Sequence, residues 1–294
     1  MSLALNYQNF SASNHAWNWA KQKRYAHLDV SIDSTGETCL IALKAASPFS
    51  FSVSMLGELV DCAREARFAS GRTVKNRVLL SNRPGVFSLG GDLAFFKECI
   101  TRRDGASLTR YALTAVEAIW ESITGSGLDD MVSIALVQGE AQGGGFEAAL
   151  ASHVLIAERG TWFGFPEGLF GLFPGMGAKS LLTARGSAEK ASRIIGSARR
   201  YSAEELHAEG VVDFLAETGC GMQMLNHVCG EIQRERLISL RRRFESIEKD
   251  ELITTVNEWA DLAMSLSEKH LRTIDYLIQA QVRARRAMPS IRVV

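Results

Sequence analysis

The stretch that decides the fold runs from residue 131 to residue 157 and reads MVSIALVQGEAQGGGFEAALASHVLIA. It begins with an apolar run at 131–137 and ends with a second one at 153–157. A glycine-rich turn and a helix-like segment lie between the two runs. Apolar runs of this length are typical of strands that are buried on both faces of a parallel sheet. The stretch therefore predicts a strand, helix and strand of an α/β fold.

The same alternation extends toward the N-terminus. The predicted elements, in chain order, are two strands within 25–44 around a Ser-Thr-Gly turn, a helix at 53–70, a strand at 76–80, and helices at 93–103 and 107–125. Strands that alternate with helices in this way indicate a mostly parallel sheet. The class expected for this part of the chain is α/β.

The pattern changes after residue 175. Helical spacing predicts helices at 176–196 and 202–208, one short strand at 211–215, and only helices from 221 to about 287. We therefore predict three parts, which are an irregular N-terminal arm at 1–24, an α/β core at 25–216 and a helical C-terminal region at 217–294.

The composition excludes several classes of protein. The 294 residues contain 33 Lys plus Arg and 33 Asp plus Glu, so the net charge is zero and a dedicated nucleic-acid binder is not expected. No run of about 20 apolar residues is present, so we expect no membrane insertion. The start of the chain lacks a basic segment followed by an apolar core, and the five cysteines form no CxxC pair. A cytoplasmic location with reduced thiols is the expectation.

Common metal and cofactor motifs are missing. The sequence contains no Walker A motif, no GxSxG and no HExxH, and its six histidines are scattered without metal-ligand spacing. Neither a metal nor a cofactor is expected. His153 opens a predicted strand and is expected to satisfy a buried hydrogen bond.

Two glycine-rich segments each lie between a predicted strand and a predicted helix. They read FSLGGD at 87–92 and QGEAQGGGFE at 138–147. Glycine lets a backbone approach a ligand closely, and free N–H groups at a helix start can bind a negatively charged oxygen. Two such segments that face each other would form an oxyanion hole. For either segment alone, tight turns and close packing remain the commoner reason for the glycines.

Two glutamates follow the second glycine segment. Glu147 lies on the first turn of the predicted helix, and Glu167 lies 20 residues later in Phe-Pro-Glu-Gly. If both point into one cleft, their repulsion raises one pKa, and the pair can then act as general acid and base. The alternative for each is a favourable charge at the start of a helix.

Three segments in this order and spacing resemble the crotonase superfamily, which contains the enoyl-CoA hydratases and isomerases. They are LGGDL at 89–93, GGGFE at 143–147 and FPEGLFGLFPGMGA at 165–178, and the likeness covers about residues 30–215. The resemblance implies the crotonase fold, a spiral of ββα units with mostly parallel strands, followed here by a helical C-terminal region. It implies Gly91 and Gly144 as backbone oxyanion donors, with Gly90 and Gly143 beside them. It also implies Glu147 as one of two catalytic glutamates.

By the same resemblance Glu167 is the second of these glutamates. A closer resemblance is to the diffusible signal factor synthases, which are bacterial crotonases that make cis-2-unsaturated fatty-acid signals. It extends to about residue 286 because NEWADLAMSLSEKHLRTIDYLIQAQ at 257–281 looks like that branch.

This branch implies dehydration of a 3-hydroxyacyl thioester on acyl carrier protein, followed by hydrolysis of the thioester. Possible partners are then the carrier protein or CoA and the receiver domain of a sensor kinase, and a homotrimer or hexamer is expected. The alternatives are an ordinary enoyl-CoA hydratase or isomerase, or a non-catalytic protein that binds acyl chains.

An acyl chain requires an apolar tunnel. The residues expected to line it or to adjust its selectivity are Gln142, Leu172, Phe173, Met176, Trp259, Met264 and Leu277. The alternative is that these residues are ordinary core, as is usual for Met and aromatic side chains at helical spacing. Two basic clusters, at 234–243 and 283–286, are candidates for contact with a phosphate or an acidic carrier, or else form solvated helix faces.

Overall fold

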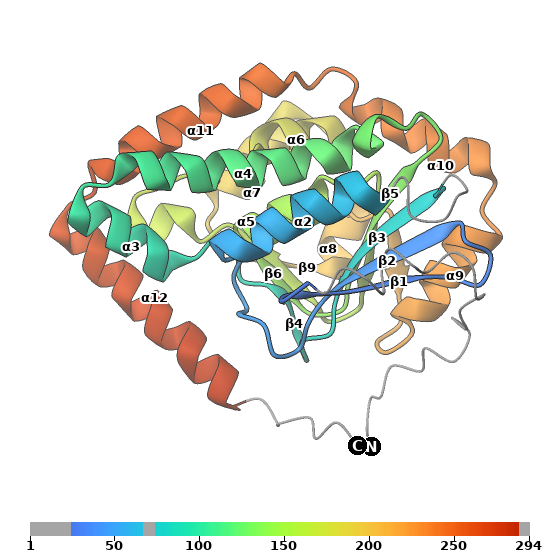
Figure 1. The fold of residues 1–294 in the computed structure, drawn as a ribbon, viewed down its shortest axis with the longest axis horizontal. Helices are drawn as coiled ribbons and strands as arrows, with labels where there is room; N and C mark the ends of the chain where they lie inside the picture. The colour runs from blue at the N-terminus through green and yellow to red at the C-terminus, as the bar shows by residue number, and fades with distance from the viewer. Residues whose placement is uncertain (1–24, 67–73, 288–294) are drawn as a thin grey trace.

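The computed structural model describes residues 25–66 and 74–287 (Figure 1). A six-stranded sheet lies at the centre of this part of the chain. Its strands, in spatial order, are β1 (Leu28–Ile32), β2 (Thr38–Leu43), β3 (Asn76–Ser81), β5 (Val132–Val137), β7 (Val154–Glu158) and β10 (Phe214–Ala216). Only β1 and β2 pair antiparallel in this sheet, and the other neighbours are parallel. The predicted α/β class with a mostly parallel sheet is therefore confirmed.

Both faces of this sheet are covered by helices. Along β2, Ile41 belongs to the main core, and its neighbour Leu40 belongs to a second core on the other face. The main core is completed by α2 (Val53–Ala66), α4 (Gly105–Ile123) and α11 (Lys249–Met264), and the second core by α9 (Gly221–Gly230) and α10 (Arg234–Arg241). Burial on both faces explains the continuous apolar runs of β5 and β7.

A second sheet of three-residue strands carries the candidate site. Its strands, in spatial order, are β4 (Val86–Ser88), β6 (Glu140–Gln142), β8 (Trp162–Gly164) and β9 (Arg200–Ser202). Because β4, β6 and β8 follow β3, β5 and β7 directly, the chain repeats a unit of two strands and a helix. The pairing of β4 with β6 brings the two glycine-rich segments side by side. These short strands were not predicted, since three residues are too few to show a period of two.

The remaining helices follow the strands or end the chain. They are α3 (Leu93–Arg102), η2 (Gly125–Gly127), α5 (Gly144–Leu150), η3 (Glu167–Phe170), α6 (Ala178–Arg185), α7 (Ala188–Gly196), α8 (Ala203–Ala208), η4 (Arg242–Phe244) and α12 (Glu268–Ala287). The helical segment predicted at 176–196 is confirmed, but as two helices, α6 and α7. Helix α6 ends before Gly186, and Ser187 caps α7 by accepting from the Lys190 N–H. No helix in 25–66 and 74–287 is long and apolar enough to cross a bilayer.

The strand predicted at 211–215 begins later, at Phe214. The N–H groups of Val211 and Val212 donate to Leu206 O and close the end of α8 instead of joining the sheet. The boundary predicted at residue 216, between the α/β core and the helical C-terminal region, coincides with the end of β10. The division of the chain into these parts stays a prediction. The predicted arm at 1–24 lies outside the described residues.

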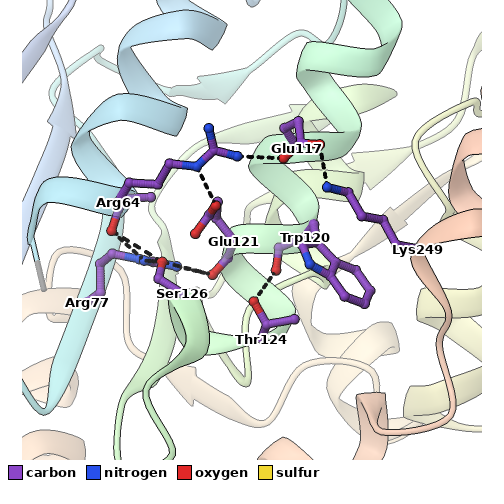
Figure 2. Close-up of polar contacts among 9 residues, drawn as sticks. Arg64, Arg77, Glu117, Trp120, Glu121, Thr124, Ser126 and Lys249 are labelled. Atoms are coloured by element: carbon purple, nitrogen blue, oxygen red, sulfur yellow. Dashed lines mark hydrogen bonds and ion pairs between the residues drawn. The ribbon is translucent and has the colours of Figure 1, made fainter.

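A polar network fixes α4 against the neighbouring elements (Figure 2). Arg64 on α2 forms ion pairs of 2.6 Å with both Glu117 and Glu121 on α4. Arg77 on β3 is buried and donates to Glu121 O and to Ser126 Oγ. A buried guanidinium is costly unless its donors are satisfied, so these bonds fix the position of α4 relative to the sheet. That position matters because α4 lines the candidate site.

Candidate active site

A cavity of about 430 Å³ opens beside the second sheet. Its walls come from the two glycine segments, η3, α3, α4 and the C-terminal helices α11 and α12. The predicted site residues that line it are Gly91, Gln142, Gly143, Gly144, Glu147, Glu167, Leu172, Met176, Trp259 and Leu277. Phe173 and Met264, also predicted for the tunnel, are not among its lining residues and pack against the core instead. Gly90 lies behind the wall, against the second glycine segment. The structure thus brings together residues from five separate parts of the sequence.

The two glycine segments touch through their backbones. A Cβ atom on Gly90 would lie 2.8 Å from Gln142 O and 3.0 Å from Gly144 N. Gly90 also has a φ of +89°, which favours glycine. Any side chain at position 90 would therefore separate the two segments.

Hydrogen bonds orient the N–H groups of Gly91 and Gly144. A trans peptide directs its C=O and its N–H in opposite directions. Phe51 N–H donates to Gly90 O at 2.8 Å, so the Gly91 N–H of the same peptide points away from Phe51. Gly143 O likewise accepts from the first turn of α5, at 2.9 Å from Phe146 N, so the Gly144 N–H points away from that turn.

Both N–H groups are left available to a ligand. Within residues 25–66 and 74–287, neither Gly91 N–H nor Gly144 N–H donates to an acceptor. A Cβ atom on Gly144 would lie 3.7 Å from Gly91 N, so the two donors are neighbours on the cavity wall. The Gly144 N–H also lies at the start of α5, where the helix dipole favours negative charge. Two such donors can bind one carbonyl oxygen and stabilise negative charge on it.

Glu147 lies on the first turn of α5 and lines the same cavity. It is 1% exposed, and its Oε1 accepts from Met176 N–H at 2.7 Å and from Ala178 N–H at 3.0 Å. Burial raises the pKa of Glu147 to about 7, although the two N–H donors oppose this by favouring the charged form.

Glu167 lies at the start of η3 and lines the same cavity. Its Oε2 is buried and has no hydrogen-bond partner among the described residues. Burial and then the nearby charge of Glu147 raise the pKa of Glu167 to about 8. Because the two N–H bonds favour charge on Glu147, a proton shared by the pair near neutral pH resides mainly on Glu167. Such a pair holds one acid and one base at once.

The rest of the cavity is mostly apolar. Trp259 on α11 packs edge-to-face on Phe96 at 5.1 Å, and a Cβ atom on Gly175 would lie 2.7 Å from its ring. Leu277 lies on α12, which contacts α3 and η3. Lys97 fixes α12 to α3 through an ion pair of 2.6 Å with Asp275. The C-terminal helices therefore form part of the cavity wall as well as part of the core.

Several cavity residues were not predicted from the sequence. They are Tyr111, Ala112 and Ala115 on α4, and Glu140, Ala198, Arg199 and Arg200 around β6 and β9. Arg200 forms an ion pair with Glu140 at 3.2 Å and lies over Trp162. Ala198 has a φ of +48°, an uncommon conformation that precedes the two arginines. The one sequence feature that could have indicated these residues is the adjacent pair of arginines before α8.

The basic cluster predicted at 234–243 is mainly structural. Arg234 donates to Asn76 Oδ1 at 2.7 Å, and Arg241 donates to Met131 O at 2.6 Å. Arg243 forms an ion pair of 2.9 Å with Asp213. The proposed contact of these three arginines with a partner phosphate is thus not favoured. In the second cluster, Arg283 lies over the ring of Tyr276, and the side chains at 285 and 286 lie outside the described residues.

The predicted role of His153 is confirmed. Its Nδ1 accepts from Ser133 N–H at 2.9 Å, and its Nε2 lies 2.9 Å from Ile123 O. Burial lowers the pKa of His153 to about 3, so the ring is neutral. Among the described residues, no group of three or more His, Cys, Asp or Glu side chains is arranged to hold a metal ion.

Comparison with known proteins gives a consistent result. The profile of the enoyl-CoA hydratase/isomerase family matches residues 36–235. A probable enoyl-CoA hydratase of Mycobacterium bovis is 34% identical over 121 residues, which are 39% of this chain and 47% of the relative. The chain spans between 19% and 47% of the length of the curated relatives that match first.

Solved structures share the fold. A putative enoyl-CoA hydratase from Streptomyces avermitilis superposes with a TM-score of 0.72 at 20% identity, covering 90% of this chain and 96% of that one. Pseudomonas aeruginosa DspI superposes with a TM-score of 0.61 at 24% identity, covering 86% of this chain and 96% of that one. At these identities the likeness establishes the fold alone.

Proposed function

The chain belongs to the enoyl-CoA hydratase/isomerase family, and from this premise we propose that it removes water from a 3-hydroxyacyl thioester with a medium or long acyl chain. The observation that carries the proposal is the arrangement of Glu147 and Glu167 beside the free N–H groups of Gly91 and Gly144. Acid, base and oxyanion donors are the three groups that this elimination requires.

The proposed dehydration proceeds at the C2 and C3 atoms of the substrate. The ionised glutamate takes a proton from C2, and the electron pair moves toward the thioester oxygen, which the two N–H groups stabilise. The pair then returns to form the C2–C3 double bond as the C3–O bond breaks. The protonated glutamate gives its proton to the departing hydroxyl, which leaves as water. The reverse sequence of steps is the hydration of an enoyl thioester.

We further propose that the same site hydrolyses the enoyl thioester, as in the diffusible signal factor synthases. Water would attack the thioester carbon, and one glutamate would take a proton from water. As the C–S bond breaks, a protonated glutamate of the pair would give its proton to the departing thiolate. The oxyanion of the tetrahedral intermediate would bind the same two N–H groups. The sequence resemblance over 257–281 and the cavity wall formed by Trp259 and Leu277 support this finer proposal.

The proposed carrier of the acyl group is acyl carrier protein, with CoA as the alternative. Both present the acyl group on a pantetheine arm that ends in a phosphate. Arg199 and Arg200 line the cavity, where each forms an ion pair with one glutamate, Glu205 and Glu140 respectively. A phosphate would compete with these partly exposed carboxylates for the two guanidinium groups. A homotrimer or hexamer and a regulatory contact with a receiver domain remain predictions from the resemblance.

Product analysis tests the proposal. The purified protein is incubated with 3-hydroxydodecanoyl-acyl carrier protein and, separately, with crotonyl-CoA, and the products are identified by mass spectrometry against cis and trans standards. The expected product is free cis-2-dodecenoic acid. A double variant with Glu147→Gln and Glu167→Gln, purified in the same way, controls for a contaminating thioesterase.

Each of the other possible results overturns a defined part of the proposal. Dodecenoyl thioester without free acid would sustain dehydration and overturn hydrolysis. Hydration of crotonyl-CoA alone would leave an ordinary hydratase and overturn the synthase assignment. Turnover of neither substrate would overturn the enzymatic proposal and leave a protein that only binds acyl chains.

A further inference from the structure

Tyr111 is a buried tyrosine on the cavity wall that none of the proposed chemical steps uses. It lies on α4, is 5% exposed, and packs edge-to-face on Phe96 with ring centroids 5.1 Å apart. A second ring, that of Phe95, lies 5.5 Å away. The ring is therefore fixed on two sides, and the position of the hydroxyl is fixed with it.

The Tyr111 hydroxyl connects two backbone segments that are distant in sequence. It donates to Phe51 O at 2.7 Å and accepts from Asp92 N–H at 3.2 Å. Asp92 also caps α3, because its Oδ1 accepts from Phe95 N–H at 3.1 Å. One hydroxyl thus bonds to the residue that follows Gly91 and to the residue that holds Gly90 O.

These bonds surround the peptide that carries the Gly91 N–H. Phe51 lies beside Gly91 as in a parallel strand pair, and its N–H holds Gly90 O. On the same edge, the Tyr111 hydroxyl bridges Phe51 O and Asp92 N–H. Without the hydroxyl, Phe51 O and Asp92 N–H each lose a bond. The peptide between Gly90 and Gly91 is then held by the bond from Phe51 N–H to Gly90 O with less support, and it has more freedom to rotate. Oxyanion stabilisation depends on donors that are fixed before the reaction, so rotation weakens it.

We propose that Tyr111 is a positioning residue that aims the Gly91 N–H at the thioester oxygen. This inference rests on the proposed function, since it assumes that Gly91 is an oxyanion donor. The hydroxyl carries one hydrogen, and Phe51 O accepts it, so Tyr111 does not itself donate to substrate. Its contribution is made through the backbone.

The test compares Tyr111→Phe with the wild-type chain and with Tyr25→Phe. Phenylalanine keeps the contacts of the ring with Phe95 and Phe96 and removes only the hydroxyl. Tyr25 is also buried, but its hydroxyl bonds to Glu65 and to neither glycine segment. We expect the kcat of Tyr111→Phe to fall about 10- to 100-fold, less than for loss of an entire oxyanion donor, with KM changed less than about threefold. The control should keep its wild-type kcat.

A spectroscopic probe reports the oxyanion hole directly. A conjugated thioester such as cinnamoyl-CoA absorbs at longer wavelength when hydrogen bonds polarise its carbonyl. We expect bound cinnamoyl-CoA to show a red shift with the wild-type chain and with Tyr25→Phe, and a smaller one with Tyr111→Phe. Tyr111→p-aminophenylalanine keeps a hydrogen-bonding group on the ring and is expected to recover most of the shift and of kcat.

The outcomes separate this inference from the proposed function. If the wild-type chain shows neither turnover nor a red shift, the proposed function fails. If the wild-type chain shows both and Tyr111→Phe matches it, the positioning role is overturned. A raised KM with an unchanged kcat would also overturn it, because Tyr111 would then bind substrate. If Tyr111→Phe does not fold, Tyr111→p-fluorophenylalanine decides by the same two readouts, because its fluorine fills the space of the hydroxyl but has no hydrogen to donate to Phe51 O.

Discussion

The carboxyl group of Glu167 lies against the Cα atom of Gly143, so a methyl group at position 143 would occupy the space of Glu167 Oε1. Gly143 also has a φ of +51°. The absence of a side chain at Gly143, just before α5, therefore leaves room for the carboxyl group of Glu167 at the start of η3. The second glycine segment thus helps to place Glu167, one of the two proposed acid–base groups, and also carries a proposed oxyanion donor.

Gly143→Ala should reduce dehydration at least about tenfold, because the new methyl group displaces the Glu167 carboxyl and the backbone conformation becomes strained. The measurement is the steady-state rate with a 3-hydroxyacyl thioester, together with the melting temperature. Gly196→Ala is the matched control, since a Cβ atom there meets nothing within 4 Å. An unchanged rate for Gly143→Ala would show that the position of Glu167 is not critical.

Glu147→Gln and Glu167→Gln should each lower the dehydration rate by about 10²- to 10⁴-fold, the range typical of general acid–base groups. Both variants keep the volume of the side chain, so the circular dichroism spectrum should not change. Exchange of the C2 hydrogen with D₂O identifies the base, and we expect one of the two variants to lose it and the other to keep it.

Glu189→Gln on the surface of α7 serves as the control for these two variants, and its rate should equal that of the wild-type chain. A Glu147→Gln or Glu167→Gln variant with full activity would remove that residue from the mechanism. Loss of circular dichroism signal would instead point to a structural role.

The pH dependence of stability should also report Glu167. Its pKa rises from an ordinary value of 4.5 to about 8 in the folded chain, mainly through burial. A raised pKa means that the folded state binds the proton more tightly than the unfolded state does. The resulting stabilisation is complete below the unfolded pKa and is lost as the pH rises through about 8. Glu167→Gln lacks this loss.

The melting temperature of Glu167→Gln relative to wild type should therefore increase from pH 5 to pH 9. Thermal unfolding followed by circular dichroism at intervals of one pH unit measures it. A constant difference across this range would contradict the raised pKa. Glu189→Gln, on the surface, should show a flat difference.

The length of the acyl chain should depend on α4. Ala115 lines the cavity and is 1% exposed, so Ala115→Phe fills part of the space for the chain. We expect a loss of about tenfold or more in kcat/KM for a twelve-carbon thioester and little change for a four-carbon one, since a pocket that is too small excludes by steric overlap. Ala106→Phe, exposed on the same helix, is the control. Equal losses on both substrates would indicate a general disruption of packing.

The parts of the site that could be predicted lie close together in sequence. Glu147 follows its glycines within a few residues, on the first turn of the helix that begins there, so the local pattern and the chemistry agree. Glu167 follows at a spacing that a family resemblance identifies. In each case, a short stretch of sequence is enough to identify the residue that the structure places at the cavity.

The parts that could not be predicted depend on contacts between distant segments. The hydroxyl of Tyr111 bonds to Phe51, 60 residues away, while the spacing of the helix shows only that Tyr111 faces a core. In the sequence, Arg234 and Arg241 look like part of a surface cluster. In the structure, they donate hydrogen bonds to carbonyl groups of the loop before β5. Long side chains reveal their partners only when the tertiary structure places an acceptor within reach.

The C-terminal helices have a consequence for how such enzymes diverge. The family profile ends at residue 235, yet Trp259 and Leu277 lie beyond it and line the cavity beside Glu147. The proposed reacting groups and the part of the cavity wall formed by α11 and α12 are thus encoded in separate stretches of one chain. If the proposed function holds, mutations after residue 235 can alter which acyl chain is accepted while Glu147, Glu167 and the two glycine N–H groups stay unchanged. A graft of these helices onto a relative would then transfer selectivity as a module.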